Sequence, residues 1–264
     1  MTSTLLLLLA VTSASPGPGT DYARAPAACA ARSGAVTLPL VELYTSEGCS
    51  SCPAADRWFS RQRDPDAANW LAFHVDYWDE LGWRDRFGAP AHTRRQRERA
   101  WAWSSATIYT PQVMLGPTIH APWRTPPRFA ALLRAARTPA RAGLAMRVHR
   151  APSGNWQVRV AAARVAGSRG TEAQLWLARW VDDQHTAVKA GENRGVALRH
   201  DHVVQGLWGP WALDARATTH EVTIAPLAGK WGMVAFVQDA RGDTLQSLEL
   251  AASRCPATEP TRVQ

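Results

Sequence analysis

Two cysteines in the string Cys49-Ser50-Ser51-Cys52 have a spacing that could do chemistry. An apolar, β-prone run precedes the string and ends at Gly48, and Pro53 follows where a proline suits the start of a helix. Two thiols three positions apart on a helix project from neighbouring turns on one side, within reach of a disulfide bond. The sequence therefore predicts a strand that leads into a helix whose first turn carries both cysteines.

The two thiols are expected to differ in reactivity. Cys49 would lie exposed at the amino end of the helix, where free N–H groups and the macrodipole favour a thiolate. Cys52 would lie one turn deeper and be better shielded. This asymmetry suits reversible thiol–disulfide exchange, in which Cys49 forms a mixed disulfide with the substrate and Cys52 resolves it.

Metal binding is the main chemical alternative for the same pair. Half a zinc site needs two further ligands, yet the chain has no second Cys-x-x-Cys, and His74, His92 and His120 are not at ligand spacing. Exported cysteine pairs also bind Cu(I), but Met-rich or His-rich companions are missing. The prediction is a redox dithiol with no metal and no bound cofactor.

The longer string ELYTSEGCSSCPAAD, with HVDYWDELGWRDRF and YTPQV further on, closely resembles an uncharacterised bacterial and plant family of secreted, thioredoxin-like proteins. The resemblance runs from about Pro39 to the end of the chain. It implies the strand, Cys-x-x-Cys and helix arrangement of thioredoxin, with a cis proline facing the cysteines. That proline would be Pro111, so that Thr110 can pair edge-on with an extended peptide. The activity of the family is not established, so the resemblance implies a fold and not a function.

Thioredoxin carries a buried acid on the strand that leads to its cysteines, and Glu42 lies on the corresponding strand here. Glu42, with its pKa raised by burial, is therefore the expected proton relay for Cys52. An ion-paired or edge-exposed Glu42 is the alternative, and Asp76 is the second choice for the relay. Glu47, beside the cysteines, would oppose thiolate formation unless it faces water.

Two further segments stand out by their composition. Trp78 and Trp83 lie in an aromatic, charged insertion and either wall the site, binding substrate, or pack as ordinary core and interface residues. The string from Gly191 to His202 also resembles the family. It forms either a loop that faces a ligand or an ordinary turn.

The elements that must position these residues follow from apolar periodicity. Strands are expected over 36–45 and 69–77 on either side of a helix over 53–63, as a parallel βαβ unit. The next elements are a helix over 91–103, strands over 108–115 and 118–122, and a helix over 126–137. After a linker at 138–143, short alternating runs separated by turn signals favour a β-sandwich-like domain over 144–255. The expected fold class is therefore α/β: a thioredoxin-like domain over 35–137, followed by a mainly-β, β-sandwich-like C-terminal domain.

The ends of the chain indicate an exported protein. A short apolar run followed by small residues predicts a signal peptide over 1–14, too short to span a bilayer, so the expected location is periplasmic or secreted. Residues 15–34 are expected to be a flexible leader and 256–264 a tail. Cys29 and Cys255 either form a structural disulfide or remain unpaired thiols.

The formal charge of +8 is carried by arginines scattered along the chain. This distribution does not predict nucleic-acid binding. The expected partners are exported proteins with thiols or disulfides, without nucleic acid or a membrane span. The rival hypothesis is a non-catalytic binding or scaffold protein whose Cys49–Cys52 disulfide is structural. An exposed Cys49 sulfur beside a cis Thr110–Pro111 bond would favour the enzyme, and a covered sulfur the scaffold.

Overall fold

The computed structural model describes residues 29–255 except 63, 169–171, 215 and 227. The expected signal peptide (1–14), residues 15–28 of the expected leader, and the expected tail (256–264) lie outside the described residues. Among the described helices, none is long and apolar enough to cross a membrane.

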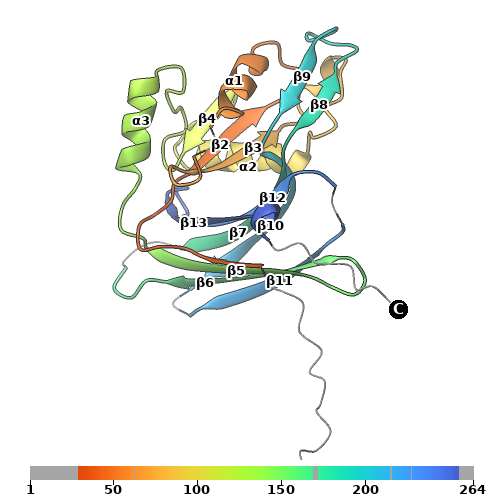
Figure 1. The fold of residues 1–264 in the computed structure, drawn as a ribbon. Helices are drawn as coiled ribbons and strands as arrows, with labels where there is room; N and C mark the ends of the chain where they lie inside the picture. The colour runs from red at the N-terminus through yellow and green to blue at the C-terminus, as the bar shows by residue number, and fades with distance from the viewer. Residues whose placement is uncertain (1–28, 63, 169–171, 215, 227, 256–264) are drawn as a thin grey trace, which may run out of the picture.

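Two packed β-sheets, three α-helices and a separate hairpin make up the described chain (Figure 1). The larger sheet has seven strands in the spatial order β13 (Thr244–Ala251), β12 (Trp231–Asp239), β7 (Ala173–Val181), β10 (Val203–Leu213), β3 (Asn69–His74), β2 (Leu40–Thr45) and β4 (Gln112–Leu115). The smaller sheet has four strands in the order β1 (Cys29–Arg32), β5 (Ala142–Arg150), β6 (Trp156–Arg164) and β11 (Thr218–Ile224). The hairpin consists of β8 (Gln184–Ala187) and β9 (Ala197–His200). The α-helices are α1 (Cys52–Phe59), α2 (Pro90–Trp101) and α3 (Pro126–Ala135), and short 3-10 turns cover Asp79–Leu81 and Ala252–Arg254.

The expected fold class, a thioredoxin-like α/β domain followed by a β-sandwich-like domain, is wrong. The described residues hold thirteen strands and only three α-helices, and strands from both expected domains share the seven-stranded sheet. The parallel pairing of β3 with β10 joins them, with Ala72 beside Val203 and its N–H donating to the carbonyl of His202 at 2.8 Å. Sequence patterns could not show this pairing because it joins segments far apart in the chain.

The local βαβ prediction is confirmed, because β2 and β3 run parallel with Leu40 beside Asn69. β4 pairs antiparallel with β2 on its other side. The predicted strand over 118–122 contains only a bridge between Thr118 and Leu115. The strand that precedes the cysteines is therefore central in its part of the sheet and held on both edges.

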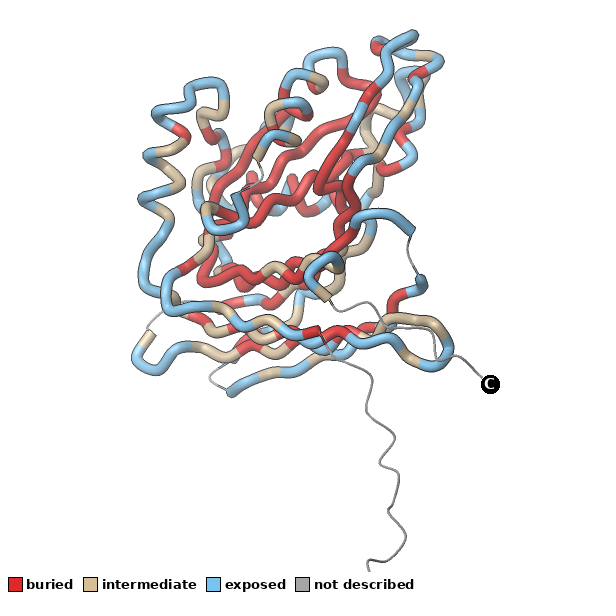
Figure 2. Tube along the Cα trace, viewed as in Figure 1, coloured by how far each residue is buried: buried red, intermediate tan, exposed pale blue. Residues whose placement is uncertain are grey.

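Strand alternation divides the core into three regions (Figure 2). The region between the two sheets is filled by side chains such as Met146, Val160, Leu177, Met233 and Ala235. The second region lies under α2, where the Arg95 guanidinium sits within 5.5 Å of the ring centres of Phe73, Trp176 and Phe236. The third region packs β2, β3 and β4 against α1 and α3 through side chains such as Val41, Leu43, Phe59 and Phe129. The end of the sheet that carries the cysteines therefore has helices on both faces.

A disulfide joins the two ends of the described chain. Cys29 begins β1 and bonds to Cys255 with a Cα–Cα distance of 5.0 Å. β1 pairs with β5, placing Cys29 beside Val148, so residues 29–32 of the expected leader form a strand. The cross-link attaches this outer strand to the C-terminal end of β13.

Replacing both Cys29 and Cys255 with Ser is expected to lower the free energy of unfolding by roughly 2–5 kcal/mol. The disulfide spans 226 residues, and in the chain-entropy account its loss gives the unfolded chain more freedom. Urea unfolding followed by tryptophan fluorescence measures the change, with the Cys49–Cys52 disulfide verified by a thiol count. An unchanged midpoint would contradict the prediction.

Candidate redox site

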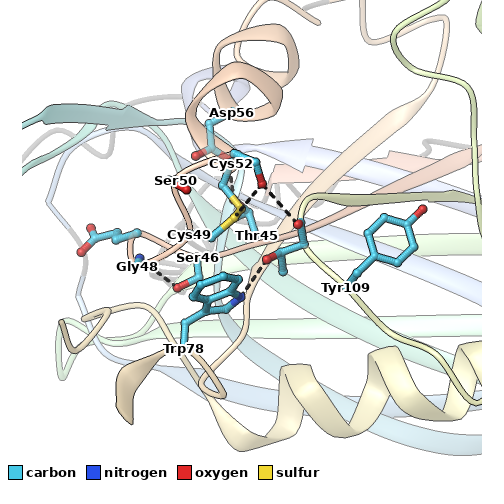
Figure 3. The surroundings of a disulfide bond; sticks show 12 residues. Thr45, Ser46, Gly48, Cys49, Ser50, Cys52, Asp56, Trp78 and Tyr109 are labelled. Atoms are coloured by element: carbon cyan, nitrogen blue, oxygen red, sulfur yellow. Dashed lines mark hydrogen bonds between the residues drawn. A yellow bond between two sulfur atoms is a disulfide. The ribbon is translucent and has the colours of Figure 1, made fainter. Parts of the chain in front are cut away.

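The cysteine pair lies in the connection between β2 and α1 (Figure 3). Cys49 and Cys52 form a disulfide with a Cα–Cα distance of 5.4 Å. Two backbone hydrogen bonds shape the turn: the N–H of Cys49 donates to Ser46 at 3.2 Å, and the N–H of Cys52 donates to Cys49 at 3.1 Å. The strand and the helix thus hold the disulfide from both sides.

The expected exposure and position of Cys49 are both wrong. Both cysteines are 0% exposed, and α1 begins at Cys52 instead of Cys49. Pro53 lies in the first turn of α1, a position that a proline tolerates because no helical hydrogen bond is lost there. The thiol at the amino end of the helix is therefore that of Cys52, and Cys49 belongs to the preceding turn.

The loop between β8 and β9, residues 188–196 (the cover loop), is hydrogen-bonded to the backbone around Cys49. Asn193 is buried, and its side-chain amide donates to the carbonyls of Glu47 at 2.8 Å and Cys49 at 2.9 Å. Glu192 accepts a hydrogen bond from the N–H of Ser50 at 3.0 Å, and its hydrogen bonds with Ser50 lower the pKa of Glu192. The cover loop is therefore hydrogen-bonded to the backbone before, at and after Cys49.

A glycine allows the cover loop to come this close. Gly191 has a φ of +70°, and a Cβ added there would lie 3.1 Å from Cβ of Trp83. Any other residue would meet both backbone strain and a collision. The indole N–H of Trp83 donates to Oε2 of Glu47 at 2.8 Å, so Trp83 supports the turn from beneath the cover loop.

On the opposite side, one hydroxyl separates the disulfide from Thr110. Oγ of Ser51 lies 3.4 Å from Sγ of Cys49 and 3.5 Å from the carbonyl oxygen of Thr110. The indole N–H of Trp78 donates to Oγ1 of Thr110 at 2.8 Å, as Figure 3 shows. The Thr110–Pro111 bond is cis, which confirms that part of the prediction.

An open groove of about 410 Å³ begins at this point. Its lining includes Ser51, Tyr109, Thr110, Pro111, His120 and Trp123. Tyr109 stacks on His120 with ring centres 5.6 Å apart, and burial raises the pKa of Tyr109. Neither Trp78 nor Trp83 is among the residues that line the groove. Its aromatic rings are those of Tyr109, His120 and Trp123, which were not predicted to bind substrate.

Glu42 is completely buried on β2, but the expected rise of its pKa is wrong. Burial alone would raise the pKa, yet Arg95 and Arg99 outweigh it and lower the pKa of Glu42 to about 2. Arg95 donates to both carboxylate oxygens, at 2.9 and 3.0 Å, and the Tyr44 hydroxyl donates at 2.7 Å. A carboxylate held this firmly as an anion is a poor proton relay, which matches the ion-paired alternative. Asp76, the second choice, accepts a hydrogen bond from the Thr93 hydroxyl on α2.

Another group of acids and histidines is buried beside the cysteines. Asp56, on α1, accepts a hydrogen bond from the Thr45 hydroxyl at 2.8 Å. The ring of His200, from β9, has Nδ1 3.5 Å from Asp56 Oδ2 and Nε2 3.7 Å from Glu47 Oε1. In the part of the chain that the structure describes, no cluster of three or more His, Cys, Asp or Glu is arranged to hold a metal ion.

His74 and Asp85 form an ion pair next to this group, with Nδ1 and Oδ2 2.6 Å apart. Burial opposes both charges, but each partner favours the charge of the other. The pKa of Asp85 is consequently lowered to about 2, and the pKa of His74 is raised. The His74 ring meets the His200 ring edge-on, with centres 4.8 Å apart.

Sequence reasoning missed Asp56, Asn193 and His200 as site residues. Asp56 had a local signal, since it follows Cys52 by four positions and therefore shares its helix face. Asn193 and His200 lie in the string over 191–202 that was expected to be a ligand-facing loop or a turn, but nothing in the sequence placed that string at the cysteines. The pairing of β10 with β3 and the hydrogen bonds of Asn193 do so.

The fold and the site define a mainly-β protein with a buried Cys-x-x-Cys disulfide between a strand and a helix. The family model described as "Protein of unknown function (DUF1223)" matches residues 40–238, which include the disulfide, the groove and the cover loop. The chain therefore belongs to the DUF1223 family.

Solved structures share the fold at low sequence identity. A crystal structure of a protein from Agrobacterium tumefaciens aligns with a TM-score of 0.59 and 23% identity, covering 80% of this chain and 93% of that one. HBP35 of Porphyromonas gingivalis aligns with a TM-score of 0.61 and 13% identity, covering 88% of this chain and 79% of that one. At these identities the likeness extends to the fold alone. A comparison with curated proteins found no match.

Glu42→Gln is expected to lower the free energy of unfolding at neutral pH by about 3 kcal/mol, because Arg95 and Arg99 then lack a buried counter-charge. The folded-state pKa of about 2 lies below the ordinary 4.5, so the carboxylate stabilises the fold fully above pH 4.5. That stabilisation is lost as the pH falls through 2.

Urea unfolding from neutral pH to pH 2 tests this prediction. The stability difference between wild type and Glu42→Gln should shrink below pH 4.5. Glu98→Gln is the matched control, since Glu98 is exposed on α2. A difference that stays constant across this range would contradict the assignment.

Asn193→Ala is expected to increase the rate at which reduced glutathione opens the Cys49–Cys52 disulfide by roughly thirtyfold. The variant loses two hydrogen bonds to the turn, each with a net contribution of about 1 kcal/mol. Arg194→Ala, on the exposed side of the same loop, is the matched control. Equal rates for the two variants would show that Asn193 does not limit access.

Proposed function

We propose that this protein is an exported thiol–disulfide oxidoreductase that exchanges its Cys49–Cys52 disulfide with thiols of other exported proteins. The contact that carries the proposal is the Ser51 hydroxyl, which lies between Sγ of Cys49 and the carbonyl of Thr110 at the start of the groove. The disulfide is thus one side chain away from an open surface. The Cys29–Cys255 disulfide supports an oxidising compartment, periplasmic or secreted.

An extended substrate segment in the groove would lie along Thr110 and Pro111 and contact Tyr109 and Trp123. Trp78 acts indirectly, because its indole holds the Thr110 hydroxyl. Trp83 holds Glu47 and the cover loop in place. Aromatic rings and a backbone carbonyl, which can accept a second hydrogen bond besides that from Ser51, suit a peptide of varied sequence.

The reaction runs through a mixed disulfide and needs no bound cofactor. A substrate thiolate attacks Sγ of Cys49, the Cys49–Cys52 bond breaks, and its electron pair leaves on Cys52, which takes up a proton. A second substrate thiolate then attacks the substrate sulfur and releases Cys49 as a thiolate. The substrate loses two electrons as its disulfide forms, and the cysteine pair gains them. The reverse sequence reduces a substrate disulfide.

Complete burial of both cysteines is the specific observation that favours a second candidate, a scaffold protein with a structural disulfide. The two candidates differ in what reaches the sulfur of Cys49. For the enzyme, movement of the cover loop or of Ser51 must expose Sγ while the rest of the fold stays intact. For the scaffold, only unfolding exposes it.

Cys52→Ser tests the proposal, because it leaves a Cys49 thiol that cannot be resolved. Under native conditions the variant is expected to bind one glutathione per chain from oxidised glutathione, and to pass it to a reduced, unfolded test protein. Peptide mass spectrometry locates the adduct on Cys49. Cys49→Ser is the matched control and should react much more slowly. An adduct that forms only in denaturant would support the scaffold instead.

A further inference from the structure

We propose that His200 and Asp56 hold the proton that Cys52 takes up when the disulfide opens and gives back when it closes. The inference rests on the proposed exchange function and deepens it. It adds a residue from the C-terminal part of the chain to the chemistry of the cysteines.

Several buried polar atoms around His200 have no hydrogen-bond partner among the described residues. His200 is 2% exposed, Asp56 5% and Glu47 0%. Both ring nitrogens of His200, Oδ2 of Asp56 and Oε1 of Glu47 lack a hydrogen-bond partner among the described residues. Leaving buried polar atoms unpaired costs free energy, so such a concentration at one point calls for a functional explanation.

More acidic than basic side chains lie around His200. Three acids and one further base lie in this region. Glu47 belongs to the turn before α1, Asp56 to α1, Asp85 to the segment after the 3-10 turn at Asp79–Leu81, and His74 to β3. His74 and Asp85 neutralise one another at 2.6 Å. His200 then faces two carboxyl groups with one imidazole. One imidazole between two buried carboxyl groups is an arrangement in which neighbouring groups can exchange a proton.

The other hydrogen bonds of Asp56 and Glu47 leave one oxygen of each carboxyl group facing the His200 ring. Thr45 donates to Oδ1 of Asp56, and Trp83 donates to Oε2 of Glu47. The second oxygen of each carboxyl group is thereby left facing the His200 ring. The proton can therefore reside on the imidazole or on either acid with little change of geometry.

Helix α1 connects this proton to the sulfur chemistry. Asp56 follows Cys52 by one helical turn on the same face of α1, and both side chains are buried. When a substrate thiolate bonds to Sγ of Cys49, the electron pair of the broken bond leaves on Cys52, and the shared proton moves to that sulfur. When the mixed disulfide is resolved, Cys52 returns the proton to the pair, attacks Cys49 and expels the substrate as a thiolate.

The test uses the Cys49→Ser variant, in which Cys52 is a free thiol and Cys29–Cys255 stays oxidised. Ultraviolet thiolate absorbance across pH gives the midpoint of Cys52 ionisation. Adding His200→Asn removes a neighbouring cation, which should raise the midpoint by about 1 pH unit. Adding Asp56→Asn removes a neighbouring anion, which should lower it by about as much. His185→Asn, an exposed histidine on the paired strand β8, is the matched control and should leave the midpoint unchanged.

Shifts of the Cys52 midpoint in opposite directions distinguish the proposal. If the two residues had only a structural role, their replacement would not shift the midpoint in opposite directions. Circular dichroism and urea unfolding check that each variant folds; if His200→Asn does not, His200→Gln and Asp56→Asn carry the test. Midpoints equal to that of the control would overturn the inference. The titration needs no substrate, so it can fail while glutathione exchange at Cys49 remains. If the Cys52 midpoint shifts as expected but Cys49 exchanges no glutathione, the proposed function is overturned while the proton site at His200 and Asp56 is supported.

Discussion

The parallel contact between β3 and β10 is the constraint on which the site depends. One backbone hydrogen bond, from Ala72 to His202, marks the point where the two parts of the chain become one sheet. His200 and the cover loop lie just before β10 in the chain, so the pairing fixes them above the cysteines. The C-terminal part is consequently a structural component of the redox site, and a variant that loosens this contact would change the site as well as the fold.

The structure buries charge in two different ways on either side of β2. Glu42 is fully compensated by two arginines, a tyrosine hydroxyl and Gln238, and such a carboxylate stays ionised because every oxygen is paired. On the other side, Glu47 and Asp56 share the single His200 and keep free oxygens. The first arrangement gives specificity to the packing of α2 against the sheet. The second leaves polar atoms without hydrogen-bond partners next to the cysteines, and on these atoms the proposed proton site depends.

The Cys49–Cys52 disulfide is buried, but the layer that covers it is thin on one side. Ser50 and Ser51 are exposed while Cys49 and Cys52 are not, so the cover is one residue thick on the groove side. On the other side it consists of a loop held by hydrogen bonds from and to side chains. In the proposed enzyme, opening the cover would break these few contacts and leave the sheets folded. The same contacts would protect the disulfide from small thiols when no substrate is bound.

The sequence alone determined two local features: the cysteine pair between a strand and a helix, and the parallel β2–α1–β3 unit. The cis bond before Pro111 followed from the resemblance of its motif to the family. Each depends on residues that are neighbours in the chain or on a motif contained in one stretch. Tertiary structure alone decided the fold class, the ion-paired state of Glu42, the covered position of Cys49, and the presence of Asn193 and His200 at the site. Those properties depend on which strands pair across the whole chain and on which charges meet after packing. Local periodicity carries no information about either, because a pattern of apolar residues defines a buried face without naming what will cover it.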